Sequence, residues 1–387
     1  MPPKNRFAEL HDEITGWRRH LHENPELLFD TPKTSAFIKE RLEDIGVDEL
    51  VTGIGRTGVV AVMKGKTDTS GKVIGLRADF DALPIFEATG LDYASKTEGK
   101  MHACGHDGHT AMLLGAAKYL SETRNFDGTV VLIFQPAEEG GAGGKEMVDD
   151  GMMDRWNVQE VYAIHNWPGA PAGTFATRAG PFLAATDQFE IDVVGKGGHA
   201  AMPNTTIDTT LVASHIVIAL QSIVSRNVNP VEQAVISVTS FETESKAFNV
   251  IPSQVMLKGT VRTLTAENRE LCEERLKLVA TSTAAAYGAT ATVNYIKGYP
   301  AMVNHETETE HAIQGAKNVA GDCGEAPLVM GGEDFAYMLE SRPGAFIVLG
   351  NGDSATLHHP EYNFNDDIIP TGCSWFAEMV ETRMPAK

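Results

Sequence analysis

The sequence predicts an α/β fold in which a small α+β domain is inserted into a larger one. The chain has 387 residues, more than one hydrophobic core usually organises. Strand-like and helix-like segments alternate in the first half and again near the end, as in sheets with helices on both faces. Between residues 183 and 297 the order becomes strand, helix, strand, strand, helix, strand, that of a ferredoxin-like unit. We therefore expect a discontinuous domain at 1–182 and 298–387 and an inserted domain at 183–297.

The elements of the discontinuous domain follow from local patterns. Residues 5–45 have helical periodicity, which is interrupted at the turn-rich segment "HENPELLFDTPKT". Short apolar runs then predict strands, in order "GVVAVMKG", "KVIGLRADFDALP", "GTVVLIFQP", "VQEVYAI" and "GAFIVLGNG". The segment "GHTAMLLGAAKYLSET" predicts a helix that leaves a histidine-rich stretch. Polar residues follow several of the strands, which predicts a site along that edge of the sheet.

The inserted domain has its own complete set of elements. Strands are predicted at "DQFEIDVVGKG", "AVISVTSFETE", "SQVMLKGTVRTL" and "TATVNYIKG". Helices are predicted at "DTTLVASHIVIALQSIVSRN" and "AENRELCEERLKLVATSTAAAYG". These six segments are enough for a separate small domain.

Composition and charge exclude several classes of protein. The formal net charge of −20 repels phosphate backbones, so we expect no nucleic-acid partner. No apolar run approaches the roughly 20 residues of a membrane span, and the N-terminal segment has no signal-peptide core. We therefore expect a cytoplasmic protein with no membrane partner. The four cysteines are too few and too scattered for a disulfide framework.

Five loops at the predicted strand and helix ends carry candidate metal ligands. They hold Cys104 and His106, Glu138 and Glu139, His165, His199, and His358 and His359. Each loop alone is more typical of solvated polar residues, but thiolate, imidazole and carboxylate together suit zinc, manganese, cobalt or nickel. A structural zinc site would favour four Cys or His ligands at close spacings such as CxxC. The mixture here fits a hydrolytic site with open coordination positions better.

The adjacent glutamates allow a division of labour. One carboxylate can bind a metal ion while the other takes a proton from the attacking water as general base. The sequence alone leaves open whether Glu138 or Glu139 has each role.

A series of motifs resembles one known family. In order, they are "RRHLHENPEL", "GLRADFDALP", "MHACGHDGHT", "FQPAEEGGAGG", "AIHNWP", "GKGGHAAMP", "NVIP", "GTVRT", "GGEDFAYM" and "LHHPEYNFND". This series is similar to the amidohydrolase branch of the aminoacylase-like metallopeptidases, peptidase family M20. That branch includes hippurate hydrolases, N-acyl-amino-acid amidohydrolases and plant auxin-conjugate hydrolases. The resemblance covers nearly the whole chain.

The resemblance implies a site with two divalent metal ions, manganese or zinc, with cobalt or nickel as alternatives. It implies that Cys104 is the bridging ligand. The other ligands would be His106, Glu139, His165 and His358. It makes Glu138 the general base and Asp79 a residue that orients the ligands. Arg77 stands where the wider superfamily has a ligand histidine, so His106 takes over that role. His102, His109 and His359 have no ligand role.

The resemblance also makes the inserted domain a lid and dimerisation domain, and hence the protein a homodimer or higher homo-oligomer. His199 would reach a neighbouring subunit's active site and stabilise the oxyanion, although a turn histidine is the simpler interpretation of it. Asn249 and Arg262 would hold the substrate's carboxylate, which a guanidinium matches in bidentate geometry. A strand-surface ion pair is the alternative for Arg262.

The predicted function is metal-dependent hydrolysis of N-acyl-L-amino acids, either hippurate-like or N-acetylated. A dipeptidase or aminopeptidase of the same superfamily is the first alternative, and it would need an anionic group for the substrate's free amine. A non-catalytic metal-binding protein is the second, and the spare carboxylate of the Glu138–Glu139 pair argues against it.

Overall fold

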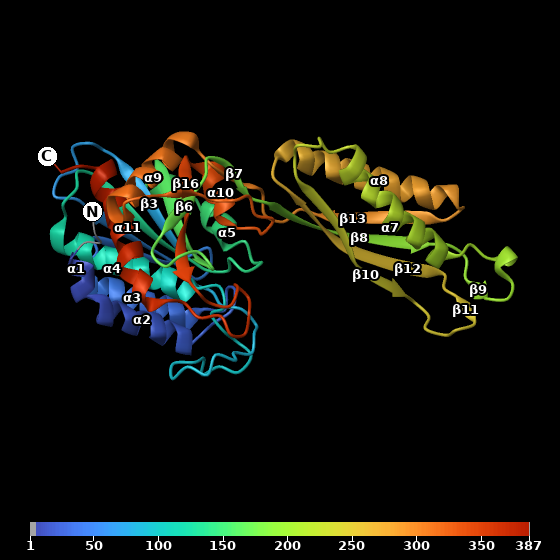
Figure 1. The fold of residues 1–387 in the computed structure, drawn as a ribbon, viewed down its shortest axis with the longest axis horizontal. Coiled ribbons are helices and arrows are strands. Elements are labelled where there is room, and N and C mark those ends of the chain that lie inside the picture. The colour runs from blue at the N-terminus through green and yellow to red at the C-terminus, as the bar shows by residue number, and fades with distance from the viewer. Residues whose placement is uncertain (1–4, 387) are drawn as a thin grey trace. The chain divides into compact units, whose positions relative to one another are not determined.

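The structure, a computed structural model, describes residues 5–386, which form two compact units (Figure 1). The first unit contains the chain up to Gly180, Val303–Pro327 and the chain from Asp334 onward. The second contains Pro181–Met302 and Leu328–Glu333. The second unit includes Leu328–Glu333, a segment that lies outside the predicted range 183–297.

The first unit is built on an eight-stranded mixed sheet. Its spatial order is β1 (Glu49–Ile54), β2 (Gly58–Lys64), β4 (Thr129–Gln135), β3 (Val73–Asp79), β5 (Glu160–Pro168), β16 (Gly344–Gly352), β6 (Phe175–Thr177) and β15 (Gly324–Glu325). Strands β4, β3, β5 and β16 are parallel neighbours. Since both faces of these strands are covered, they are mostly apolar and almost wholly buried. Their carboxyl ends therefore lie at one edge of the sheet.

Helices cover both faces of this sheet, as predicted. The helices of the first unit are α1 (Asn5–Glu9), α2 (His11–Glu23), α3 (Pro32–Ile45), α4 (His106–Thr123), α5 (Gly143–Asp149), α6 (Met152–Arg155), α9 (Glu306–Ala320), α10 (Phe335–Ser341) and α11 (Ile369–Arg383). Successive side chains of β3 point to opposite faces of the sheet. Leu76 and Ala78 join a core with Leu113 of α4 on one face. Arg77 faces the other way and lies 5.7 Å from the ring of Phe335 in α10.

The second unit is ferredoxin-like, as its element order predicted. Its four-stranded antiparallel sheet has the order β10 (Ala234–Thr243), β12 (Gln254–Thr263), β8 (Ala185–Val194) and β13 (Thr290–Ile296). Helices α7 (Thr209–Arg226) and α8 (Ala266–Ala286) share one core with alternate residues of β8 and β12. The short strands β9 (Gly198–His199) and β11 (Val250–Ile251) pair separately. The 3₁₀ helix Pro203–Thr205 also belongs to this unit, and the 3₁₀ helix Asp366–Ile368 belongs to the first. The short strands β7 (Gly180–Leu183) and β14 (Met302–Asn304) pair with each other.

Helix α7 is, among the described residues, the one helix long and apolar enough to cross a membrane by length and composition. The sequence analysis did not anticipate such a run. Ile216, Leu220 and Ile223 of α7 are fully buried in the core of the second unit. Packing in this core accounts for part of the helix's apolar character, whereas Leu211 and Ile218 are exposed.

Candidate metal centre

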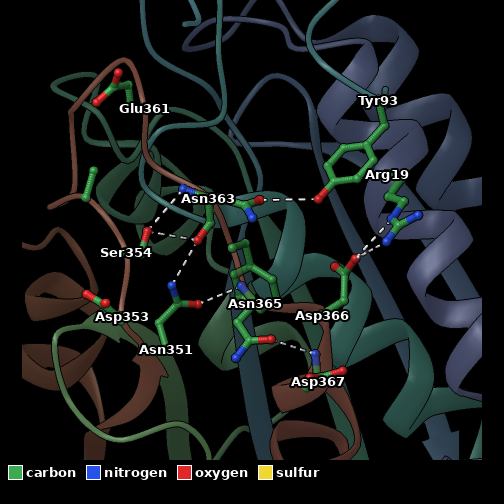
Figure 2. Close-up of a pocket in the computed structure, with 12 residues that line it drawn as sticks. Arg19, Tyr93, Asn351, Asp353, Ser354, Glu361, Asn363, Asn365, Asp366 and Asp367 are labelled. Atoms are coloured by element: carbon green, nitrogen blue, oxygen red, sulfur yellow. Dashed lines mark hydrogen bonds and ion pairs between the residues drawn. The ribbon is translucent and has the colours of Figure 1, made fainter. Parts of the chain in front are cut away.

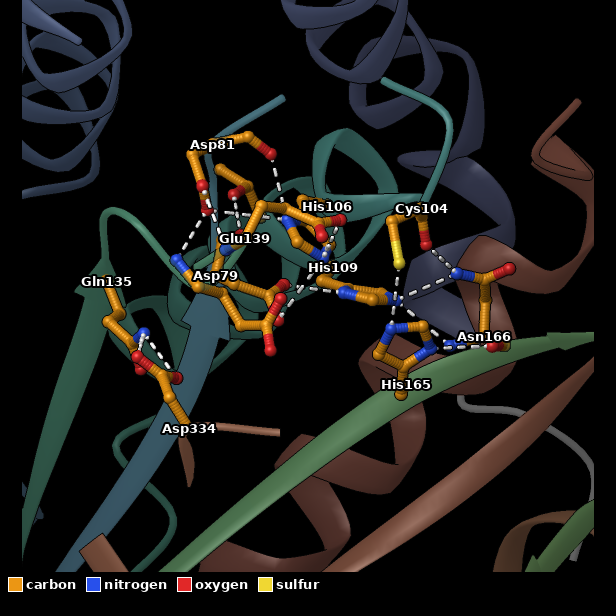
Figure 3. A network of polar contacts seen from close by, with 12 residues as sticks. Asp79, Asp81, Cys104, His106, His109, Gln135, Glu139, His165, Asn166 and Asp334 are labelled. Carbon is orange, nitrogen blue, oxygen red and sulfur yellow. Dashed lines mark hydrogen bonds and ion pairs between the residues drawn. The ribbon is translucent and has the colours of Figure 1, made fainter. Parts of the chain in front are cut away.

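Segments from four parts of the first unit bring the predicted ligands together. Cys104 and His106 lie at the start of α4, Glu139 follows β4, and His358 lies in the loop after β16. His165 lies inside β5, whereas the sequence analysis placed it after the strand. The Sγ atom of Cys104 is 3.4 Å from Nε2 of His165 (Figure 3).

Glu139 joins the remaining ligands to this group. Its Oε1 atom is 3.9 Å from Nε2 of His106 and 3.3 Å from Nε2 of His358. The backbone of His358 has a φ of 63°, and its N–H donates to the Ala103 carbonyl at 2.7 Å. This bond ties the His358 loop to the cysteine loop. Ligand atoms of Cys104, Glu139 and His358 all lie within 4.8 Å of one another.

The donor atoms of this cluster fit divalent cations. Nε2 of His106 and Oε1 of Glu139 are buried without a hydrogen-bond partner, which is rare for buried polar atoms. Nδ1 of His106 lies 2.8 Å from the Asp81 carbonyl oxygen, and Nδ1 of His165 lies 2.7 Å from the Asn166 carbonyl oxygen. Each ring therefore carries its hydrogen on Nδ1 and can offer Nε2 as a ligand.

The electrostatics of the cluster favour binding a cation. Burial and the Glu139 carboxylate raise the pKa of the Cys104 thiol well above its usual range. Burial opposes protonation of His106, but Asp79 and Asp81 outweigh it and raise the pKa of His106 to about 10. Cys104 and His106 therefore hold protons when no cation is present. Metal binding to this donor set must release them, so it should be strongly pH-dependent.

Asp79 lies behind the ligands and has the contacts that an orienting residue needs. One carboxylate oxygen accepts from Nδ1 of His109 at 2.6 Å (Figure 3). The other accepts from Arg77 at 2.6 Å. Arg77 also donates to Gln135 at 2.8 Å and to Asp334 at 3.1 Å. The arginine at the superfamily's ligand position is thus part of a buried network of charges and amides.

Asn166 is a residue of the site that the sequence analysis missed. Its side-chain amide donates to the Cys104 carbonyl at 2.6 Å, and its backbone N–H donates to Nε2 of His109 at 2.9 Å. The hydroxyl of Tyr362 donates to Asn166 Oδ1 at 2.7 Å. His109 is therefore held between Asp79 and Asn166. The signal was present, because Asn166 and Tyr362 stand in the motifs "AIHNWP" and "LHHPEYNFND".

A second buried cluster lies behind the first turn of α4. Asp107 Oδ2 is 2.8 Å from Nδ1 of His22. Burial opposes protonation of His22, but Asp107 and Glu87 raise its pKa to about 9. His102 is also buried, and neither of its ring nitrogens has a hydrogen-bond partner. Burial lowers the pKa of His102 to about 3, so this ring is neutral.

The other predicted site residues belong to the second unit. His199 lies on β9 and is exposed, and Val250 of β11 pairs with it. The Asn249 carbonyl accepts from Ala200 N–H at 3.0 Å, so His199 and Asn249 lie on the same small strand pair.

Arg262 lies apart from them on β12 and donates to the Thr260 hydroxyl and the Val261 carbonyl. Within residues 5–386 it forms no ion pair with a carboxylate, so the alternative of a strand-surface ion pair is not supported.

A polar cavity of about 380 Å³ lies elsewhere in the first unit (Figure 2). Its lining residues bond to one another: the Asn351 side chain donates to the Asn363 backbone carbonyl at 3.0 Å, and Arg19 pairs with Asp366 at 2.9 Å. None of the predicted ligands lines it. Its bonds brace the segment that follows His358.

The fold and this cluster define a class of protein, the α/β metal-dependent hydrolases. The model of peptidase family M20/M25/M40 matches residues 75–382, and the chain belongs to this family.

Similar proteins agree with this assignment. An N-acetylcysteine deacetylase of Bacillus subtilis (strain 168) is 40% identical over 371 residues, which are 96% of each chain. A hippurate hydrolase of Campylobacter jejuni is 40% identical over 378 residues, 96% of this chain and 97% of its own. The crystal structure of the Bacillus subtilis YXEP protein, described as a dinuclear metal-binding peptidase from the M20 family, has a TM-score of 0.86. It is 36% identical and covers 97% of this chain and 99% of its own. The predicted family and fold class are confirmed.

If Cys104 is a metal ligand, bound metal should protect it from alkylation. We expect iodoacetamide to modify Cys104 after chelation and not in the metal-loaded protein, because a coordinated thiolate is not free to react. Burial raises the pKa of this thiol, so the rates should be compared at alkaline pH by peptide mass spectrometry. Cys323, a partly exposed free cysteine, is the internal control and should react equally in both states. Equal reactivity of Cys104 in both states would remove it from the ligand set.

Proposed function

We propose that this protein is a metal-dependent amidohydrolase that cleaves N-acyl-L-amino acids into a carboxylic acid and a free amino acid. One observation carries the proposal: Glu138 and Glu139 lie side by side in a cluster with His106, with ligand atoms within 4.8 Å of one another. Such a cluster provides both a metal-binding carboxylate and a second carboxylate for proton transfer. Relatives about 40% identical are named as a deacetylase of N-acetylcysteine and a hippurate hydrolase.

The protein binds divalent metal ions, and we propose two of them, manganese or zinc, with cobalt or nickel as alternatives. The proposed ligands are Cys104 as the bridge, with His106, Glu139, His165 and His358. Thiolate and imidazole favour zinc and related transition metals, and carboxylate also suits manganese. Bound divalent cations polarise an amide carbonyl and lower the pKa of water.

Glu138 is the proposed general base. The side chain is almost buried, at 7% exposure, which limits competition from bulk solvent. Its carboxylate would accept a proton from the water that attacks the acyl carbonyl. The same carboxyl group would then donate that proton to the leaving amine nitrogen. Asp79 would hold the ligands in place through His109.

Residues of the second unit complete the proposed mechanism. His199 would donate a hydrogen bond to the oxyanion of the tetrahedral intermediate. Asn249 and Arg262 would bind the substrate's carboxylate. We propose that the second unit is a lid and dimerisation domain, that His199 acts in the site of a partner subunit, and that the protein is a cytoplasmic homodimer or higher homo-oligomer.

A substrate panel tests the proposed function. The apoprotein, reloaded with each divalent metal in turn, would be assayed with N-acetyl, N-benzoyl and N-indoleacyl amino acids beside dipeptides. We expect kcat/KM for the best N-acyl amino acid to exceed that for a dipeptide of the same C-terminal residue by about 10-fold or more, since a free α-amine would need an anionic partner. A preference for dipeptides would favour the peptidase alternative. Metal binding without any hydrolysis would favour a non-catalytic role.

A further inference from the structure

Asp81 links the two loops that carry the proposed catalytic groups. It lies two residues after β3 and is 1% exposed. One carboxylate oxygen accepts from the backbone N–H of Glu138 at 2.9 Å, and the other accepts from that of Glu139 at 3.2 Å. Its backbone carbonyl lies 2.8 Å from Nδ1 of His106 (Figure 3). One residue therefore contacts the proposed base and two proposed ligands.

The loop that Asp81 holds has an unusual backbone. Ala137, just before the glutamates, is buried and has a φ of 54°, a left-handed conformation that non-glycine residues rarely adopt. This turn aims two consecutive N–H groups at one carboxylate. Fixing both peptide groups also fixes the directions in which the Glu138 and Glu139 side chains leave the backbone. The carboxylate of Asp81 thus opposes relaxation of the turn.

Asp127 is another buried aspartate, and its hydrogen bonds only anchor a loop. Asp127 is also 1% exposed in the first unit and accepts from Thr69 N–H at 2.6 Å and from the Thr67 hydroxyl at 2.7 Å. Its partners are surface-loop residues without a proposed catalytic role. The hydrogen bonds of Asp81, in contrast, come from residues of the metal and base sites.

We propose that Asp81 is a positioning residue that sets the two roles of the glutamate pair. Its carboxylate directs Glu138 as base and Glu139 as ligand. Its carbonyl oxygen selects the Nδ1–H form of His106, which leaves Nε2 for the metal. This inference rests on the proposed function of the same site.

Asp81→Asn tests the carboxylate, because asparagine keeps the shape but replaces one acceptor oxygen with an NH₂ donor. One of the two glutamate N–H groups would then face a donor. We expect kcat to fall about 10- to 100-fold and metal affinity about 10-fold, with KM within about 3-fold of the unaltered protein. The absorption spectrum of the Co²⁺-loaded protein should shift as well, since Glu139 is displaced.

Asp127→Asn is the matched control. It should lower the urea midpoint of unfolding while leaving kcat, metal affinity and the Co²⁺ spectrum unchanged. If Asp81→Asn behaves in the same way, Asp81 is only a loop anchor and the inference is wrong. If Asp81→Asn does not fold, Asp81→Glu, which keeps both oxygens on a longer stem, should show the same fall in kcat and shifted spectrum. The Co²⁺ spectrum needs no substrate, so it tests Asp81 even if the unaltered protein hydrolyses no amide.

Discussion

Replacing Glu138 with glutamine is expected to leave the metal sites filled and to lower kcat by about 10²-fold or more. Glutamine has nearly the same shape but cannot accept the proton of the attacking water. The backbone N–H of residue 138 would still donate to Asp81, so the loop should keep its conformation. Metal content by elemental analysis and kcat on the best N-acyl amino acid would measure the two effects separately.

Two control variants make this result specific. Glu139→Gln should lose metal and activity together, because Oε1 of Glu139 is the buried oxygen without a hydrogen-bond partner beside His106 and His358. Glu146→Gln, on α5 where the side chain pairs with Arg56, should change neither quantity. Parallel loss of metal and activity in Glu138→Gln would make Glu138 a ligand and reverse the proposed roles.

Much of the fold could be predicted from the sequence because its strands and helices have distinct patterns. Strands β3 and β4 are buried and mostly apolar because both their faces are covered, whereas burial alternates along β8 and β12 because mainly one face packs on α7 and α8. The end of β5 was harder to predict. The polar pair His165–Asn166 looked like a loop, but β5 continues through it as a neighbour of β16.

The side chains that the structure brings together at the proposed metal centre could also be named from the sequence, mainly because the family's motifs are specific. The residues that support this cluster could not. The bond from Glu138 N–H to Asp81 spans 57 positions of the sequence, and that from Asn166 to the Cys104 carbonyl spans 62. No local spacing indicates such pairs, since the folded sheet edge brings them together. An aspartate or asparagine in a loop is more often a turn former, so these roles emerge only from the three-dimensional contacts.

Replacing His199 with alanine is expected to lower kcat by about 10²- to 10³-fold with metal content and folding unchanged, since the lost hydrogen bond would form mainly with the developing oxyanion. The histidine is exposed on β9 in the second unit, whereas all the proposed ligands belong to the first. Its removal should therefore disturb neither core. His215→Ala is the matched control, because His215 is a histidine of the same unit whose ring stacks on Tyr287. That variant should keep full activity.

Mixing His199→Ala with Glu138→Gln then tests whether the histidine acts in a partner subunit. If each site combines its own Glu138 with the partner's His199, a mixed dimer contains one intact site and one doubly defective site. Random exchange makes about half of the dimers mixed, so activity should return to about a quarter of that of the unaltered protein. If both residues act within one chain, every site in the mixture lacks one of them and no activity returns. Mixed dimers must first be demonstrated, for example with two different affinity tags. Their inactivity would then restrict His199 to its own chain or remove it from the mechanism.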